Sequence, residues 1–296
     1  MLTALFVTAR IIANPIANVF QKQLTQRSAD PLFIIGATHA LLTLMSLPLL
    51  FALTNVGRGG EFWRYMLTAA LLAVGGNVLL VYALKWADLS VLGPINAYKS
   101  VISLVLAVFL VGEVPTPMGV LGVLLILAGS YLVAGDDPNQ PRRNAFVQFF
   151  RERGIQLRLA ALALSATEAV FLKKALLLSS PLTTFVLWSI LGLPIAAVAT
   201  ILLIGDRIES ELPRFRDNWL TFVSLAIATG LMQLATVFTF RTLQVGYSLA
   251  LFQLSAVISV VLGRRYFQER NFRKRLVGSA VMAAGAALIV VLGRRS

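Results

Sequence analysis

Charged side chains lie inside apolar runs of the sequence in three places. Arg10, Lys99 and Glu168 each fall within a mostly hydrophobic run that is long enough to cross a bilayer. Because an ionisable group is costly at membrane depth, such residues generally face a cavity and mark a substrate or ion pathway. Two cations and one carboxylate leave one positive charge uncompensated. A cavity lined by these groups would therefore favour a substrate that carries a carboxylate or a phosphate.

Uncharged polar residues recur at helical spacing beside these charges. Asn14 and Asn18 follow the first arginine at i+4 and i+8 and form one polar stripe. Asn96 and Lys99 share a second face, which begins two residues after Pro94, and a proline weakens a helix at that point. The candidate substrate-cavity residues are Arg10, Asn14, Asn18, His39, Asn77, Asn96, Lys99, Glu168, Trp188, Gln233 and Gln253. No residue is assigned as catalytic or as a metal ligand.

Each candidate also has a purely structural interpretation. A Lys99–Glu168 pair would tie two parts of the protein together, since pairing is the usual way to bury a charge. In the structural interpretation of Arg10, its long side chain would extend along the helix and place the charged guanidinium at the membrane interface. Amides such as Gln233 often hydrogen-bond between helices, and His39 is more typical of packing than of proton transfer. Glu168 is in addition a candidate for proton coupling, because desolvation raises the pKa of a carboxylate whereas nearby cations lower it.

The composition determines the environment in which these residues lie. Of 296 residues, 58% are hydrophobic and 13% are charged, and the mean hydropathy is +0.81. Soluble domains contain about 25% charged residues, so we expect an integral membrane protein. The net charge of +13 then belongs to loops that meet lipid headgroups, and it does not indicate nucleic-acid binding. The chain has no cysteine and a single histidine, which excludes thiolate chemistry and gives no reason to expect a cofactor.

Ten apolar runs are long enough to cross a bilayer. They cover residues 2–22, 31–54, 62–84, 89–111, 116–134, 157–179, 182–205, 217–240, 246–263 and 276–293. The polar insert 135–156 separates two sets of five, and its phenylalanines among arginines are typical of an interfacial amphipathic segment. We therefore predict an all-α polytopic membrane protein, with a first five-helix repeat over 1–134, a linker over 135–156 and a second repeat over 157–296.

A comparison of the two halves supports this division. With a shift of 156 positions, Trp63 falls on Trp219 and Glu113 falls on Glu269. A unit with five crossings ends on the side opposite to its start, so the second copy must be inverted, as in transporters whose substrate site lies between inverted repeats. The loop charges agree with this, because 112–117 contains no Lys or Arg and 264–275 contains six.

The basic residues are distributed unequally between the two faces of the membrane. Most of them follow odd-numbered spans, where Lys22 and Arg158 are counted as loop residues. By the positive-inside rule, that face is cytoplasmic and both termini lie outside.

The ends of the two halves carry a family resemblance. Residues 109–113 (FLVGE), Pro115 and the glycine-containing stretch 122–129 resemble the end-of-repeat signature of EamA-type transporters in the drug/metabolite transporter superfamily. A weaker copy runs over 266–269 (YFQE), with Gln268 where the family usually has glycine. The resemblance implies a ten-helix carrier with a central cavity, often an exporter, with both termini in the cytoplasm. That orientation is the opposite of the one that the charges predict.

These observations together predict a secondary transporter, in the exporting direction, for a small metabolite such as an amino acid. We expect it to work by alternating access in a bacterial inner membrane, as a monomer or a weak homodimer. A channel-like uniporter and a non-transporting sensor subunit are alternatives. A membrane-embedded enzyme is a further one, but the sequence contains no H-E-x-x-H, G-x-G-x-x-G or Walker motif and no cysteine nucleophile.

Overall fold

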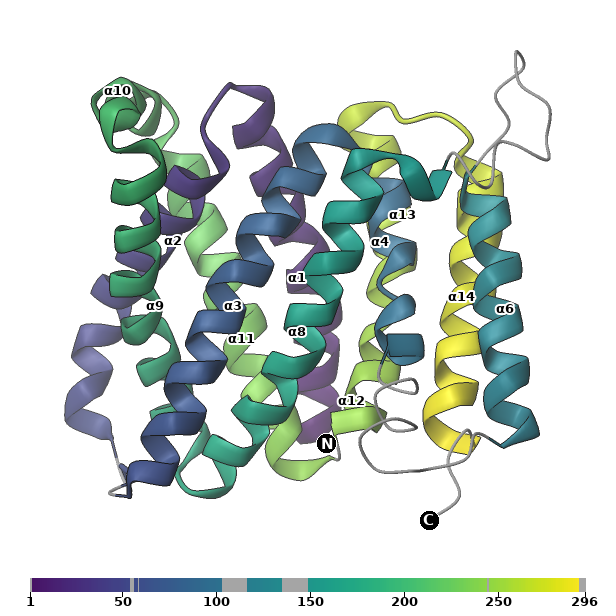
Figure 1. Cartoon of the computed structure of the whole chain (residues 1–296), viewed down its shortest axis with the longest axis horizontal. Helices are drawn as coiled ribbons and strands as arrows, with labels where there is room; N and C mark the ends of the chain where they lie inside the picture. The colour runs from purple at the N-terminus through teal and green to yellow at the C-terminus, as the bar shows by residue number, and fades with distance from the viewer. Residues whose placement is uncertain are drawn as a thin grey trace.

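The architecture was obtained as a computed structural model, which describes residues 2–53, 56–57, 59–102, 116–134, 149–243 and 245–292. All regular structure in these ranges is helical. The elements are α1 (Leu2–Gln26), α2 (Pro31–Ser46), η1 (Leu47–Ala52), α3 (Gly60–Trp86), α4 (Leu89–Ile95), α6 (Pro117–Ala134), α8 (Arg153–Leu177), α9 (Pro181–Ile204), η2 (Gly205–Arg207), α10 (Ile208–Asp217), α11 (Trp219–Thr242), α12 (Val245–Phe252), α13 (Ser255–Phe267) and α14 (Phe272–Leu292). The long helices stand side by side in one bundle (Figure 1).

The bundle has the composition of a membrane-spanning structure. Seven helical segments of the described residues are long and apolar enough to cross a bilayer. The predicted membrane location is confirmed to this extent. Of the predicted spans, 89–111 continues beyond residue 102, outside the described residues, and the linker lies outside them as far as residue 148.

Residue types at the helix starts explain two of the boundaries. Asp30 precedes Pro31, and its carboxylate accepts a hydrogen bond from the backbone N–H of Leu32 at 2.9 Å. Ser180 precedes Pro181 in the same way and accepts from a backbone N–H in the first turn of α9. A capping side chain followed by proline is a strong signal for a helix N-terminus, so both of these spans begin where the sequence predicts.

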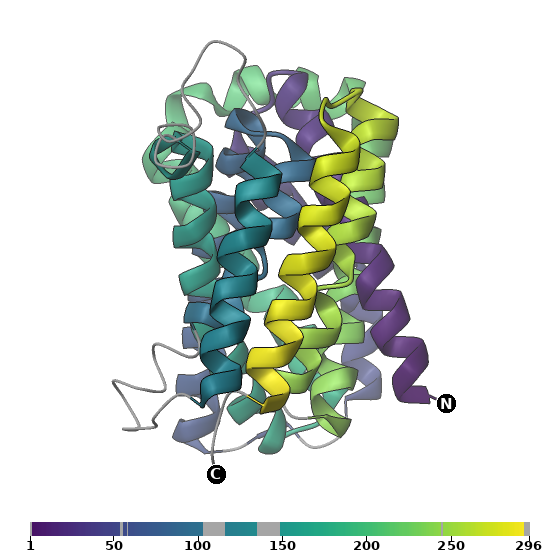
Figure 2. The same ribbon diagram turned by 90° about the vertical axis from the view of Figure 1, so that its right-hand side faces the viewer.

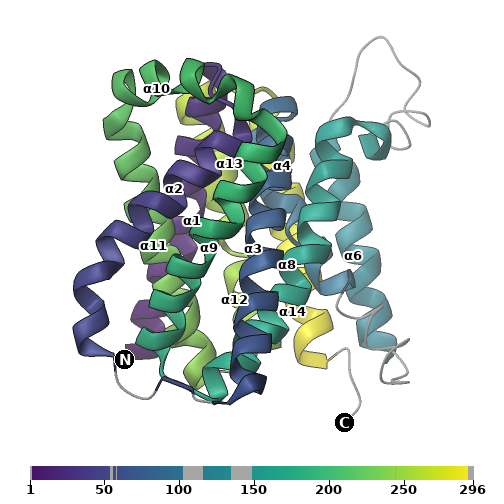
Figure 3. The same cartoon turned by 60° about the vertical axis from the view of Figure 1, so that its left-hand side comes forward.

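One helix lies where we predicted a loop. Residues 208–217 form the amphipathic helix α10 at one end of the bundle (Figure 3). Glu211 is buried there, where it pairs with Arg214 and accepts a hydrogen bond from the Asp30 backbone N–H. The segment is too short and too polar to be recognised as a span, and its few apolar residues include a proline at 213.

Helices from the two halves of the chain pack against each other in five antiparallel pairs. The pairs are α1 with α11, α2 with α9, α3 with α8, α4 with α13 and α6 with α14. The sequence repeat places α1 on α8 and α3 on α11. Exchange of the two halves therefore converts the α1–α11 pair into the α3–α8 pair. Each of the other three pairs is converted into itself. In Figure 1, α1 and α14 begin at opposite ends of the bundle, so α14 ends at the end where α1 begins.

Glycines permit the closest of these contacts, between α6 and α14 (Figure 2). A Cβ on Gly122 would lie 2.7 Å from the carbonyl oxygen of Gly285, and a Cβ on Gly129 would lie 2.7 Å from that of Gly278. No side chain fits at such distances, so the two backbones touch. Gly122 and Gly278 are equivalent in the sequence repeat, as are Gly129 and Gly285.

The fourth and ninth predicted spans are not continuous helices. The first is interrupted at residues 96–97 and the second at 253–254. At each break i→i+3 bonds occur, for example from the Lys99 N–H to the Asn96 carbonyl (3.0 Å) and from the Ala256 N–H to the Gln253 carbonyl (2.9 Å). These two bonds are 157 positions apart, one more than the repeat shift. Broken helices at membrane depth occur where the backbone lines a cavity.

Candidate functional site

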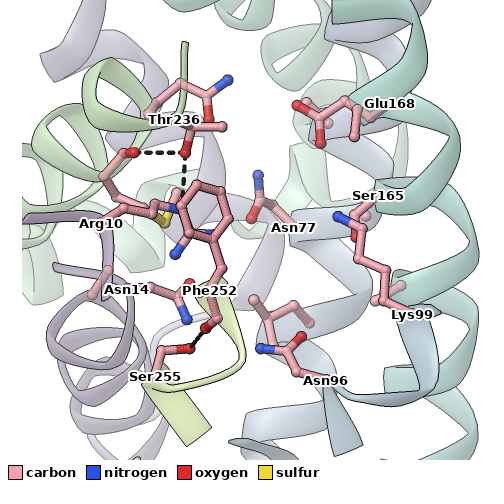
Figure 4. A pocket seen from close by; sticks show the side chains of 18 of the residues that line it. Arg10, Asn14, Asn77, Asn96, Lys99, Ser165, Glu168, Thr236, Phe252 and Ser255 are labelled. Atoms are coloured by element: carbon pink, nitrogen blue, oxygen red, sulfur yellow. Dashed lines mark hydrogen bonds between the residues drawn. The ribbon is translucent and has the colours of Figure 1, made fainter. Parts of the chain in front are cut away.

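A cavity of about 120 Å³ lies at the level of the two broken helices. Its walls come from α1, α3, α8 and α11, from Trp188 on α9, and from the breaks that follow α4 and α12. Ten of the eleven predicted cavity residues line it, namely Arg10, Asn14, Asn18, Asn77, Asn96, Lys99, Glu168, Trp188, Gln233 and Gln253. Residues far apart in sequence therefore converge on one space (Figure 4).

His39 does not line this cavity, and its placement there is corrected. The side chain is buried on α2, where its ring lies 5.1 Å from that of Trp188. It occupies space beside Gly192, since a Cβ on that glycine would lie 2.2 Å from imidazole atoms. His39 thus supports Trp188 from behind. The sequence places both residues in spans but does not show which of them faces inward.

Arg10 forms one wall of the cavity. Its Nε donates a hydrogen bond to the Thr236 hydroxyl at 2.9 Å, and its guanidinium carbon lies 4.9 Å above the ring of Phe252. Its Nη1 is buried without a hydrogen-bond partner. The side chain is thus held inside the protein by α11 and α12 instead of extending to the membrane interface.

Lys99 and Glu168 lie on the other side of the cavity. The Glu168 carboxylate accepts a hydrogen bond from the Trp188 indole N–H at 3.3 Å. Figure 4 shows the Lys99 side chain extending past Ser165 toward Glu168. Within the described part of the chain, no ion pair of 4.0 Å or less joins the two groups, although each lies in the electrostatic field of the other. The Lys99 ammonium therefore faces the cavity without a bound partner.

A third cation in the cavity was not among the predicted residues. Arg158, counted above as a loop residue, lies on α8 with only 5% of its surface exposed, and it lines the cavity. Its Nη2 donates to the Asn96 side-chain oxygen at 2.6 Å, and its Nε is buried without a partner. Helical spacing could have identified it, because Arg158 precedes Ser165 by two turns on the polar face that also carries Glu168.

A buried ionic cluster lies at the end of the bundle where α1 ends and α4 begins. Lys22, also counted as a loop residue, is 6% exposed and its Nζ lies 2.8 Å from Oε1 of Glu269. The same carboxylate accepts hydrogen bonds from the backbone N–H groups of Leu89 and Ser90, both at 2.8 Å, at the start of α4. Arg275 completes the cluster with a 2.5 Å hydrogen bond to the Ser90 hydroxyl. We call these groups the Glu269 cluster.

A turn at the end of α13 aims Glu269 into this cluster. Gln268 adopts a left-handed conformation with φ of 53°, which reverses the chain after the helix. Glycine adopts this conformation without steric cost, which explains why a glycine would suit this position. Gly263 leaves room for the returning carboxylate, since a Cβ there would lie 2.4 Å from Oε2 of Glu269.

At the opposite end of the bundle, Lys173 repeats part of the arrangement around Lys22. Lys173 donates to the carbonyl oxygens of Phe240 and Leu243, the latter at 3.5 Å. Lys22 likewise donates to the Ala87 carbonyl oxygen at 3.2 Å. Ala87 and Leu243 are equivalent at the shift of 156. Glu113, the repeat counterpart of Glu269, lies outside the described residues, as do Ser103 and the Asp136-Asp137 pair of the linker.

Comparison with a family model identifies the first part of the chain. Residues 2–135 match the EamA-like transporter family, which belongs to the drug/metabolite transporter superfamily. This segment, somewhat less than half of the chain, is similar to EamA-like transporters. The match includes the signature residues 109–129 and does not extend to the weaker copy at 266–269.

Comparison with solved structures concerns the whole chain. One structure, described only as "Crystal structure of protein", is similar over 98% of this chain and 96% of its own, with a TM-score of 0.64 and 16% sequence identity. At this identity the likeness concerns the fold. No curated protein sequence matches the chain.

Proposed function

We propose that this protein is a secondary transporter that exports a small anionic metabolite across a bacterial inner membrane by alternating access. Its ten spans form two inverted five-helix repeats, with the substrate site between them. The antiparallel pairs that map onto themselves support the inversion, because a two-fold axis in the membrane plane relates exactly such pairs.

The observation that carries this proposal is the charge of the cavity. Three cations, Arg10, Lys99 and Arg158, face one carboxylate, Glu168. Such an excess of positive charge in a site shielded from water is costly unless an anion occupies it. The size also favours a small metabolite, because about 120 Å³ is well below the volume of pockets for drug-sized ligands.

The Glu269 cluster supports a carrier over a channel. It joins α1, the start of α4 and the α13–α14 turn by buried charged contacts at one end of the bundle. A substrate leaves through that end only if these contacts break. Saturable exchange follows from such a closed end, whereas a continuous pore would give a flux that does not saturate.

Flux measurements in proteoliposomes test the proposal. We expect saturable uptake of a small radiolabelled anion and acceleration by the same unlabelled anion on the opposite side. Lys99→Gln is expected to lower the uptake about thirtyfold, the typical result of removing one partner of a buried charge contact. Arg153→Gln is the matched control, because Arg153 is exposed on α8 and stacks on Trp86 outside the cavity. Unchanged uptake in both the Lys99→Gln and Arg10→Gln variants would refute an anionic substrate.

A further inference from the structure

Buried donors without acceptors occur at two separate places along the cavity. Arg10 Nη1 and Gln233 Nε2 are unpaired near one end, and Arg158 Nε is unpaired near the other. A buried donor that lacks an acceptor costs about 1–3 kcal/mol, more if it is charged. The cavity is thus prepared for acceptor oxygens at both places, and not at a single point.

Helix geometry separates these two places. Arg158 and Glu168 are ten residues apart on α8, which is about 15 Å along the axis. Arg158 lies beside Asn96, whereas Arg10 lies beside Thr236 and in the field of Glu168. The two guanidinium groups nevertheless repel each other electrostatically. A single ligand placed between them could meet both.

The single described carboxylate in the cavity, Glu168, can balance only one of the three cations. Glu168 is bonded to the Trp188 indole and lies on the side of Lys99. If Glu168 balances Lys99, the charges of Arg10 and Arg158 are both left without an anionic partner among the described lining residues. The uncompensated charge is then two, one more than the sequence indicates.

We infer that the substrate is a small dianion whose two anionic groups bind separately, one at Arg10 and the other at Arg158. Dicarboxylates and phosphorylated carboxylic acids belong to this class. This inference rests on the proposed transport function and specifies its substrate. Lys99 lines the same cavity and attracts the anion as a whole. Arg158 is the residue that distinguishes a dianion from a monoanion.

Binding of isosteric acids tests the inference with purified full-length protein. Glutarate, adipate and pimelate, whose carboxylates are progressively farther apart, are each compared with the corresponding monoamide, which has nearly the same size but only one negative charge. Ligand-induced thermal stabilisation gives the affinities. We expect at least one diacid to bind about tenfold or more tightly than its monoamide, since a second buried charge contact is worth at least that factor. In Arg158→Gln this preference is expected to disappear, while the monoamide retains its affinity.

Two further variants make the result specific. Arg158→Gln without ligand should be no less thermally stable than the wild type, because removal of a buried charge that has an unpaired Nε and is repelled by Arg10 offsets the lost hydrogen bond to Asn96. Arg158→Lys keeps the charge without the planar fork and should retain part of the preference. Arg153→Gln on the same helix should behave as the wild type.

The outcomes separate this inference from the proposed function. If the monoamides bind and are transported as well as the diacids, or if Arg158→Gln keeps the full preference, the dianion inference is wrong and anion transport stands. If no anion of either charge stabilises the protein or is transported, both are wrong. A diacid preference that depends on Arg158 and not on Arg153 supports the inference.

Discussion

Replacement of Glu269 by alanine tests whether the ionic cluster holds the two halves of the bundle together. The substitution leaves the Lys22 ammonium buried without its 2.8 Å partner and leaves two backbone N–H groups at the start of α4 without an acceptor. Removing one member of a buried ion pair costs about 3–5 kcal/mol, and a lost helix cap costs about 1 kcal/mol. Lys22 keeps the Ala87 carbonyl oxygen at 3.2 Å and Asp88 at 3.7 Å, which offsets part of the loss. We therefore expect the free energy of unfolding to fall by about 3–4 kcal/mol.

The assay is unfolding in mixed micelles with increasing SDS, followed by tryptophan fluorescence and circular dichroism. Glu269→Gln keeps the shape and one acceptor oxygen, so it should cost about 1–2 kcal/mol. The double variant Lys22→Met/Glu269→Gln should cost less than the sum of its single changes, because it leaves no unpaired buried charge. Glu209→Ala, on the exposed side of α10, is the control. If Glu269→Ala loses no more than Glu209→Ala, or if the double variant is strictly additive, the cluster does not have the stabilising role argued here.

Four other expectations follow from the described contacts. Gly129→Ala should lower the unfolding midpoint, because its Cβ would lie 2.7 Å from a backbone oxygen of α14. Gly60→Ala is the control and should not lower it, because a Cβ there has no neighbour within 4 Å. Equal effects of the two substitutions would contradict the close helix contact. Glu168→Gln should abolish accumulation driven by a proton gradient while exchange of substrate persists, and unaffected accumulation would exclude Glu168 as the coupling group. Partial burial and the nearby Asp88 raise the pKa of Glu152 above its ordinary value of 4.5. At a pH above 4.5 the ionised carboxylate therefore destabilises the fold. Glu152→Gln should therefore unfold less readily than the wild type at pH 7, and the difference in the free energy of unfolding should vanish below pH 4.5. A difference that grows toward acid pH would contradict the raised pKa. A reporter that is active only outside the cytoplasm, fused to the C-terminus, should be active if the positive-inside rule decides the orientation, and inactivity would favour the cytoplasmic termini that the family resemblance implies.

The sequence predicts the membrane environment and most of the cavity, because both depend on local patterns. Long apolar runs define spans without reference to tertiary structure, and polar residues at i+4 spacing share a helix face wherever the helix lies. Asn14, Asn18 and Lys99 line the cavity for this reason. Where the pattern places a residue in a span but gives no direction, as for His39, the assignment to the cavity was wrong.

Long-range contacts and helix interruptions are harder to predict. Pro94 signals the break at residues 96–97, but the break at 253–254 has no proline beside it, and Gln253 is its sole polar residue. The buried environment of Lys22 depends on a partner from a distant segment, so this basic residue near a span end is assigned to the loop. Nothing local to Lys22 indicates Glu269, which lies 247 positions away.

The pairing of helices across the two halves has a consequence for how the molecule moves. The helix pairs α1 with α11 and α3 with α8 bind one half of the sequence to the other, and α6 with α14 does the same on the far side of the cavity. A rigid body that rocks to open one side must therefore combine segments from both halves, and cutting the chain between residues 134 and 149 would not separate two mechanical units. Each fragment would expose the surfaces that the other covers, so we expect the pieces to be degraded when made singly and to reassemble when made together.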